Sequence, residues 1–403
     1  THIKALTLYV HITLSKKFLG TPYHLIYDGS VYAWSDDIPD DSWLLGFNEP
    51  RDLSLVAEML GIKLSTFQSS IYGVSIGEIF ESSQVIPWIH VIPRREFNSI
   101  LSDLLGQLWG LCKAEGTSYY LNRFISNREL LRGLHRPLIG ATVLSKIAQS
   151  ETLKRGEILK FSPDENGYAK RTEYNLIKSS TGRLTVANGP NILTLKKVYR
   201  KIIKSRFNNG KIIQADIVSL EPRIALAIAG KEIPEDIYEH TRLNLLKSAV
   251  TRQQAKIITL SCIYGSSSWA LEKQLPNSLN AKDVIRRIRS YFNIDNLDKV
   301  LTDQYNKLGY ITNAYGRRLD PGDAIVNRYL QSTGVDVSFE VFEDINKQIL
   351  DKSDECLPIF VIHDAELFDS SKSSVQLLKD ITKDGIYIDS LQAKFPIKLE
   401  VIE

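Results

Sequence analysis

The sequence predicts an α+β protein made of two or three packed units. Its 403 residues exceed the size of one ordinary domain, about 100 to 200 residues. With 43% hydrophobic and 24% charged residues, the composition is that of a folded globular protein and not of a disordered, collagen-like or coiled-coil chain. The hydrophobic spacing changes along the chain from strand-like to helical, and later strands follow the helices.

The elements follow in that order. Alternating apolar residues at 6–14 and 23–34, then an acidic turn at 36–41, predict strands and turns in the first 95 residues. After Pro93 the apolar residues recur at helical spacing, which predicts a helical layer over about 95–165. The same spacing predicts further helices at 119–134 and 138–158. A polar segment that ends at 179–183 follows, and apolar runs then predict strands at 212–217, 360–362 and 397–401.

Charge and cysteine content exclude several classes of protein. The balance of 50 Lys and Arg against 47 Asp and Glu gives only +3, so bulk charge does not indicate nucleic acid. Three scattered cysteines, an odd number, favour a reducing compartment over a disulfide framework. No apolar stretch is long enough to span a bilayer. We therefore expect no membrane partner and a cytoplasmic location.

Two carboxylates stand at the ends of apolar strands. Asp216 ends the strand at 212–217, and Asp364 follows the strand at 359–362. Either alone is more often a helix cap or a turn residue than a metal ligand. Two carboxylates from distant strands, with cations for a polyphosphate, are what a two-metal phosphoryl or nucleotidyl transfer site requires.

The cations come from one helical segment. Arg252, Lys256, Leu260 and Tyr264 are spaced four apart, so a helix would place them on one face. Two cations one turn apart can pair with different oxygens of a triphosphate, and the aromatic group further along can meet a base or a sugar. A solvated charged face is an equally good interpretation of this segment by itself.

At these three clusters the chain resembles the family A DNA polymerases, over roughly residues 165–403. The first motif of that family is matched by Asp216, Glu221 and Arg223. The second is matched by Arg252, Lys256 and the pair Tyr264 and Gly265, and the third by His363 and Asp364. The order and spacing of all three motifs agree with the family.

Flanking segments resemble the family as well. The segment 181–184, with Arg183, resembles the start of its palm, and 236–238, with Tyr238, resembles an Asp-Ile-His motif of its fingers. The stretch containing Arg317 and Arg318, followed by Asn327 and Gln331, resembles the one that tracks the minor groove. A basic run at 196–211 without acidic residues is predicted either to follow the duplex backbone or to be a solvated face.

The resemblance implies roles for these residues. Asp216, Asp364 and the backbone carbonyl of Ile217 would hold two Mg²⁺ ions, for which Mn²⁺ could substitute, and Lys256 would join the aspartates in catalysis. The implied nucleotide-binding residues are Ser219, Glu221, Tyr238, Arg252, Lys256, Leu260 and Tyr264. The implied DNA-binding residues are Arg183, Arg223, Arg317, Arg318, Asn327, Gln331 and His363.

The implied architecture is a right hand: an antiparallel-sheet palm at 181–230 and 311–403, helical fingers at 231–310 and a reduced helical thumb at 96–180. Residues 1–95 would form an α/β appendage. Within it, 48–52 weakly resembles the second motif of the family's 3′–5′ exonuclease, although turns are the commoner use of such residues. We expect no proofreading by this chain, and a phage or plasmid source. The implied partners are primer-template DNA, dNTPs and a processivity factor or replisome protein.

Four residues depart from the family pattern: Tyr238 replaces histidine, Leu260 replaces Phe or Tyr, Ser261 replaces Gly, and Ala365 replaces the glutamate of the third motif. Two alternatives therefore stay open. One is a single-subunit RNA polymerase, against which Glu221 argues. The other is an inactive scaffold that binds primer-template DNA, against which the two retained aspartates argue.

Overall fold

The computed structural model describes residues 11–403 except 48, 50, 60–61, 66, 68–91, 114–116, 152, 277 and 321. The chain divides into two compact units after Glu129, inside helix α6 (Thr117–Gly133). This division falls within the segment 96–180, so the proposed thumb segment contributes to both units. The boundaries of palm, fingers and thumb stay a prediction. Among the described residues, no helix combines the length and the apolar character needed to cross a membrane.

The first unit contains a mixed sheet with strand order β3-β2-β1-β4. Strand β1 (His11–Leu14) pairs antiparallel with β2 (His24–Tyr27) and parallel with β4 (Ser42–Leu45). The acidic segment 36–41 is the connection from β3 (Tyr32–Ser35) to β4. Of the weakly exonuclease-like segment, Asn48 and Pro50 lie outside the described residues. The helices in the described part of this unit are α1 (Lys16–Leu19), α2 (Leu53–Met59), α5 (Arg94–Lys113) and the first part of α6.

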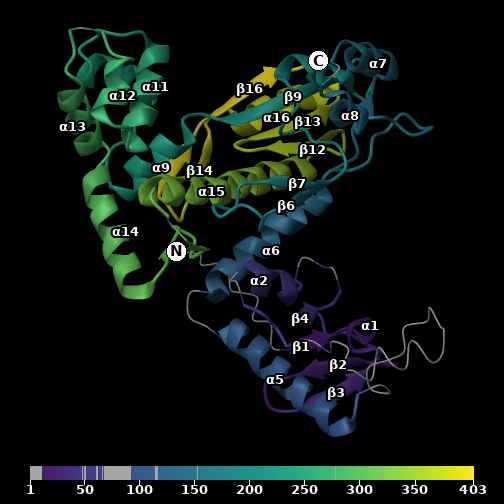
Figure 1. Ribbon diagram of the computed structural model, residues 1–403. Coiled ribbons are helices and arrows are strands. Elements are labelled where there is room, and N and C mark those ends of the chain that lie inside the picture. Colours follow the sequence, from purple (N-terminus) through teal and green to yellow (C-terminus); the bar gives the residue numbers. More distant parts are fainter. Residues whose placement is uncertain are drawn as a thin grey trace. The chain divides into compact units, whose positions relative to one another are not determined.

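The second unit is organised around an antiparallel sheet with strand order β12-β13-β9-β16 (Figure 1). Most residues of strand β9 (Lys211–Ile217) are buried, and the strand lies between β13 (Ala365–Ser370) and β16 (Ile397–Val401). Strand β12 (Cys356–Ile362) forms a hairpin with β13. The structure thus confirms the three strands expected from the sequence and the α+β fold.

Helices cover the sheet. The long helix α15 (Ile325–Leu350) contacts α16 (Lys372–Thr382), and α16 contacts β13 and β16. Asn346 of α15 donates a hydrogen bond of 3.0 Å to Glu366 of β13, so this helix packs on the face toward which Glu366 points. An apolar cluster that includes Leu144, Ile212 and Leu367 joins α7 (Ala141–Ser150) to the sheet.

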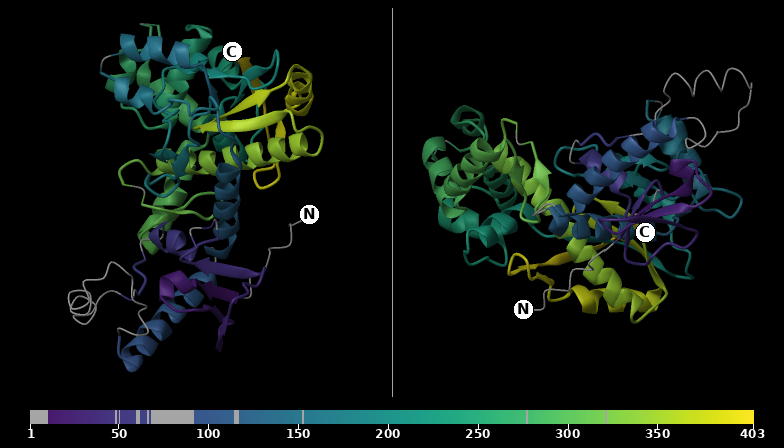
Figure 2. Two further views of the ribbon diagram at one scale, coloured as in Figure 1. Left: turned by 90° about the vertical axis from the view of Figure 1, so that its right-hand side faces the viewer. Right: turned by 90° about the horizontal axis from the view of Figure 1, so that it is seen from below.

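A group of helices lies to one side of the sheet, drawn in green in Figure 1 and again separate from the yellow strands in Figure 2. It follows α9 (Leu220–Ile228), which begins directly after β9. Its members are α10 (Ile237–His240), η2 (Thr241–Leu245), α11 (Arg252–Ile263), α12 (Ser268–Glu272), α13 (Ala281–Tyr291) and α14 (Ile294–Leu308).

One expected helix is divided. The sequence predicts a helix over 138–158, but Leu138 and Ile139 form strand β5, which pairs with β8 (Ile203–Lys204). Pro137 precedes these residues and Gly140 follows them as the N-cap of α7, so the helix cannot extend back. The segment after α7 contains the short helix α8 (Arg155–Leu159).

The remaining described elements are β6 (Glu173–Asn175), β7 (Thr185–Asn188), η1 (Lys197–Ile202), β10 (Ile311–Thr312), β11 (Arg318–Leu319), β14 (Ile386–Ile388) and β15 (Ala393–Phe395).

A glycine between β6 and β7 is required by its surroundings. Gly182 has φ +76°, and a Cβ there would lie 2.4 Å from Nη1 of the buried Arg317. We expect Gly182→Ala to lower the free energy of unfolding by about 1–3 kcal/mol, because it adds both backbone strain and a clash. Gly156→Ala in α8 is the matched control: its Cβ meets nothing within 4 Å, and alanine should stabilise the helix by up to about 1 kcal/mol. Urea denaturation of both variants checks this; equal stabilities would contradict it.

Candidate active site

The two strand-end aspartates meet at one edge of the sheet. In the register of β9 and β13, Asp216 lies opposite Ala365, the residue after Asp364. The N–H of Ile217 donates to the carbonyl of Asp364 at 3.0 Å. His363 and Asp364 form the whole connection between β12 and β13, and His363 takes a left-handed backbone conformation, φ +53°, that a two-residue turn favours. The turn and the register therefore bring together two carboxylates that are 148 positions apart in the printed sequence.

Burial and mutual repulsion disfavour the charged forms of these two groups. Burial is the larger cause and the negative charge of Asp216 the second, and together they raise the pKa of Asp364 to about 6. Burial also raises the pKa of Asp216, against a hydrogen bond from Gln214 and the charge of Lys256, both of which lower it. Two partly buried carboxylates with insufficient positive charge around them form an arrangement that a divalent cation would stabilise.

The protein supplies few further ligands there. In the described part of the chain, no group of three or more His, Cys, Asp and Glu side chains is spaced to hold a metal ion. Mg²⁺ commonly binds through one or two carboxylates and takes its other ligands from water and substrate phosphates. Two neighbouring carboxylates at the ends of adjacent strands fit that mode of binding.

Helix α11 presents Lys256 to this edge. It begins at a capping box formed by Thr251 and Gln254, which fixes where the first turn starts. Its spacing places Arg252, Lys256 and Leu260 on one face, as the sequence predicts for a helix. The charge of Lys256 lowers the pKa of both Asp216 and Asp364, so its ammonium group lies on the side of the carboxylates.

Tyr238 lies beneath both cations. The Lys256 ammonium and the Arg252 guanidinium are each 5.7 Å from the centre of its ring. Tyr238 is 4% exposed, and burial raises its pKa to about 12. A hydrogen bond with Ser219 opposes this rise in part. Its phenol therefore stays neutral near pH 7, and the ring acts as a platform for the two side chains.

Glu221 closes the side of the site next to α11. The hydroxyl of Tyr264 donates to one carboxylate oxygen of Glu221, and Arg183 donates to the other at 3.2 Å. Burial and the charge of Glu221 raise the pKa of Tyr264, which keeps its hydroxyl protonated as a donor. Ser219, in a left-handed conformation with φ +55°, starts α9 and thereby sets the position of Glu221 in its first turn.

The replaced glutamate of the third motif is not restored by its neighbour. Ala365 pairs with Asp216, so the two side chains point to the same face of the sheet, whereas Glu366 pairs with Ala215 and points to the other. Glu366 is fully buried and bonds to Asn346 of α15. Its carboxyl group therefore belongs to the packing between sheet and helix.

Two arginines from the DNA-binding set are buried. Arg223 is 3% exposed and donates to the carbonyls of Val218 and Glu235; Arg317 is 3% exposed and donates to the carbonyl of Leu176. A DNA contact would require either side chain to leave these partners. The others are more accessible: Arg183, Arg318 and His363 are exposed, while Asn327 and Gln331 lie one turn apart on α15 and are half-buried.

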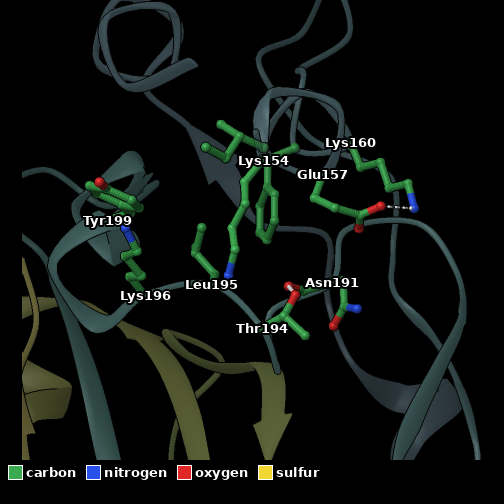
Figure 3. Close-up of a pocket in the computed structure, with 10 residues that line it drawn as sticks. Lys154, Glu157, Lys160, Asn191, Thr194, Leu195, Lys196 and Tyr199 are labelled. Atoms are coloured by element: carbon green, nitrogen blue, oxygen red, sulfur yellow. Dashed lines mark hydrogen bonds and ion pairs between the residues drawn. The ribbon is translucent and has the colours of Figure 1, made fainter. Parts of the chain in front are cut away.

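Acidic or amide partners hold much of the basic run at 196–211. Arg200 donates to Gln214 at 2.6 Å, Lys197 pairs with Glu400 at 2.6 Å, and Lys204 pairs with Glu403. Lys196 pairs with Glu151 at 2.5 Å beside a cavity of about 400 Å³, across which Lys154 extends (Figure 3). Such pairing favours the interpretation of this run as a solvated, ion-paired face over the alternative that it follows the phosphates of the duplex backbone.

Two site residues are absent from the sequence-based sets. Gln214 donates to Asp216 at 3.2 Å, and Asp236 pairs with Arg252 at 2.6 Å. Gln214 could have been found by alternation, because residues two apart on a strand share a face. Asp236 stands at the start of a predicted motif, but its partner is 16 positions away and depends on how α10 and α11 pack.

Known proteins match both the sequence and the fold. The profile described as DNA polymerase family A matches residues 127–402, more than half of the chain. The fold is similar to that of the POL domain of Pol1 from M. smegmatis, solved in complex with DNA primer-template and dNTP, with a TM-score of 0.60 and 12% sequence identity. That match covers 94% of this chain and 91% of the other.

The raised pKa of Asp364 predicts a pH-dependent stability. The folded protein binds this proton more tightly than the unfolded chain, in which the pKa of the group is near 3.8. The contribution of Asp364 to the free energy of unfolding is therefore complete below that pH and is lost as pH rises through about 6. Asp364→Asn has no charge to bury, so its free energy of unfolding lacks this decrease. We expect the metal-free variant to exceed the wild type in free energy of unfolding by on the order of 1–3 kcal/mol near pH 8, with little difference near pH 4.

Urea denaturation at the two pH values measures this difference. Added Mg²⁺ should stabilise the wild type and have a smaller effect on the variant, because one of the two carboxylates is gone. A variant that is less stable than the wild type near pH 8 would show that the burial of Asp364 is not the dominant effect.

Proposed function

The chain belongs to DNA polymerase family A and is a DNA-directed DNA polymerase, and from that premise we propose that it adds dNTPs to a primer 3′-hydroxyl at the sheet edge formed by Asp216 and Asp364. Polymerases of this family use divalent metal ions. The observation that carries the assignment of the site is the pairing of Asp216 with Ala365, which brings the two carboxylates together at a place where the charge of Lys256 acts on both.

Two Mg²⁺ ions fit this donor set, and Mn²⁺ could replace them. Asp216 and Asp364 would hold them together with the carbonyl of Ile217, and the raised pKa of both carboxyl groups supports this because a bound cation would favour their ionised forms. When bound, such a pair of ions lowers the pKa of the attacking hydroxyl and neutralises charge on the triphosphate.

The other residues would bind and orient the nucleotide. Lys256 would contact the triphosphate and provide a proton for the departing pyrophosphate, and Arg252 would bind the outer phosphate. Tyr238 supports both cations from below. His363, exposed in the turn next to Asp364, would touch the primer terminus.

Glu221 and Tyr264 would form the wall next to the incoming sugar. Their hydrogen bond fixes both side chains, and the ion pair with Arg183 fixes the carboxylate further. A rigid wall at this place would leave no room for a 2′-hydroxyl, which favours deoxynucleotides. The same wall argues against RNA synthesis as the activity of this site.

Extension of a labelled DNA primer on a DNA template tests the catalytic assignment. We expect Asp216→Asn and Asp364→Asn each to lower the rate by a factor of about 10³ or more with Mg²⁺, because each removes a charged metal ligand. Asp384→Asn changes an exposed carboxylate elsewhere on the second unit and should leave the rate unchanged. Wild-type extension combined with full activity of either site variant would refute the assignment of these aspartates.

Competition between dNTP and rNTP tests the wall. Glu221→Ala should lower the preference for dNTP over rNTP by about tenfold or more, because it removes the group that fills the 2′ position. Tyr264→Phe keeps the ring and Glu221 but loses the hydrogen bond, so a smaller loss of preference is expected. Measurement of kcat/KM for both nucleotides gives the ratio; an unchanged preference in Glu221→Ala would assign sugar selection to other residues.

A further inference from the structure

The arginine assigned to the outer phosphate is held by a carboxylate. Nε of Arg252 donates to Oδ2 of Asp236 at 2.6 Å, and Nη2 donates to Oδ1 at 3.1 Å. Both side chains are partly open to solvent, with 47% and 40% of their area exposed. The pair is bidentate, the geometry that fixes the plane of a guanidinium group as well as its position.

The carboxylate itself is immobilised. Asp236 is the N-cap of α10, and its Oδ1 accepts hydrogen bonds from the backbone N–H groups of Tyr238 at 3.1 Å and Glu239 at 3.0 Å. These hydrogen bonds and the Arg252 pair lower the pKa of Asp236 against the effect of burial, so it is ionised near pH 7. Arg252 is the first residue of α11. One fixed carboxylate thus ties together the starts of two helices.

This pairing uses only one edge of the guanidinium group. An arginine side chain has five N–H donors, and Asp236 takes one from Nε and one from Nη2. Within the described part of the chain, Nη1 of Arg252 has no hydrogen-bond acceptor. The Tyr238 ring beneath the guanidinium group restrains it further.

We propose that Asp236 is a positioning residue for the incoming nucleotide, which holds Arg252 by its Nε edge so that the Nη1 edge is presented to the outer phosphate of the dNTP. This inference rests on the proposed role of Arg252. An arginine ordered before binding loses less side-chain entropy when the triphosphate arrives, which improves nucleotide affinity without a direct contact from Asp236. The ammonium group of Lys256, which no carboxylate pairs with in the described residues, stays available to another oxygen of the triphosphate.

Asp236→Asn separates this role from helix capping. Asparagine caps a helix as well as aspartate does, so α10 keeps its start, but the neutral amide no longer forms the charged bidentate pair. In single-nucleotide incorporation, KM for dNTP should rise about tenfold while kcat changes by less than about twofold. Affinity for primer-template DNA should stay as in the wild type.

Asp283→Asn is the matched control. Asp283 forms an exposed pair of 2.8 Å with Arg286 three residues later on α13, outside the proposed site. The same chemical change there should leave KM for dNTP unchanged. Melting temperatures of both variants equal to that of the wild type would show that neither has lost the fold.

A double-mutant cycle with Arg252→Ala tests whether Asp236 acts through Arg252. In that background, Asp236→Asn should cause no further change in KM, because the side chain that it positions is absent. Additive effects would overturn the proposal, and so would an unchanged KM in the single Asp236→Asn variant. A lower KM would overturn it too, since it would show that Asp236 competes with the triphosphate for Arg252.

The same data separate this inference from the proposed function. If Arg252→Ala leaves KM for dNTP unchanged, the assignment of Arg252 to the triphosphate is wrong, and the positioning role of Asp236 is overturned with it. If Arg252→Ala raises KM and Asp236→Asn does not, the proposed function stands and only the role of Asp236 is refuted.

Discussion

The pairing of β9 with β13 is the constraint on which the site depends. Asp216 ends one strand and Asp364 precedes the other, so their meeting requires that Ala365, and no neighbouring residue, lies opposite Asp216. A slip of one position would turn every side chain of β13 to the other face. Apolar residues that alternate between two covered faces resist such a slip, as do Glu366 and Asn346, which would lose their buried hydrogen bond. The packing of the sheet against α15 thereby fixes the distance between two charged groups at its edge.

The site combines two carboxylates that repel each other with neighbouring side chains that are held in place. Its two carboxylates are partly buried next to each other, which opposes their ionisation, while Arg252 and Lys256 lie over the ring of Tyr238 and Glu221 accepts a hydrogen bond from Tyr264. The burial of the two carboxylates is unfavourable in the free protein, and a bound metal ion would relieve it. The contacts of Lys256 and Glu221 are favourable, and they hold these side chains in place before a nucleotide binds.

Several features of this molecule could be predicted from the sequence. The strands that carry Asp216 and Asp364, and the common face of Arg252 and Lys256, follow from alternation and helical spacing. The burial of Arg223 and Arg317 could not be predicted, because their carbonyl partners are set by the packing of separate elements. The break in the expected helix 138–158 depends on a strand pairing with residues more than 60 positions later. Local pattern determines local structure, whereas the partner of a polar side chain is decided by tertiary contacts.

The order of strands in the sheet also governs how the protein can be made. Strand β9 lies in the interior of the sheet, yet both of its neighbours, β13 and β16, come about 150 or more residues later in the chain. On a ribosome, β9 emerges with two unsatisfied edges and stays so while the whole intervening segment is translated, for at least several seconds at 5–20 residues per second. Asp216 and Asp364 can come together only after β13 has been synthesised, because their meeting depends on the register between β9 and β13. Until then the proposed active site cannot form, and β9 stays open to pairing with other chains.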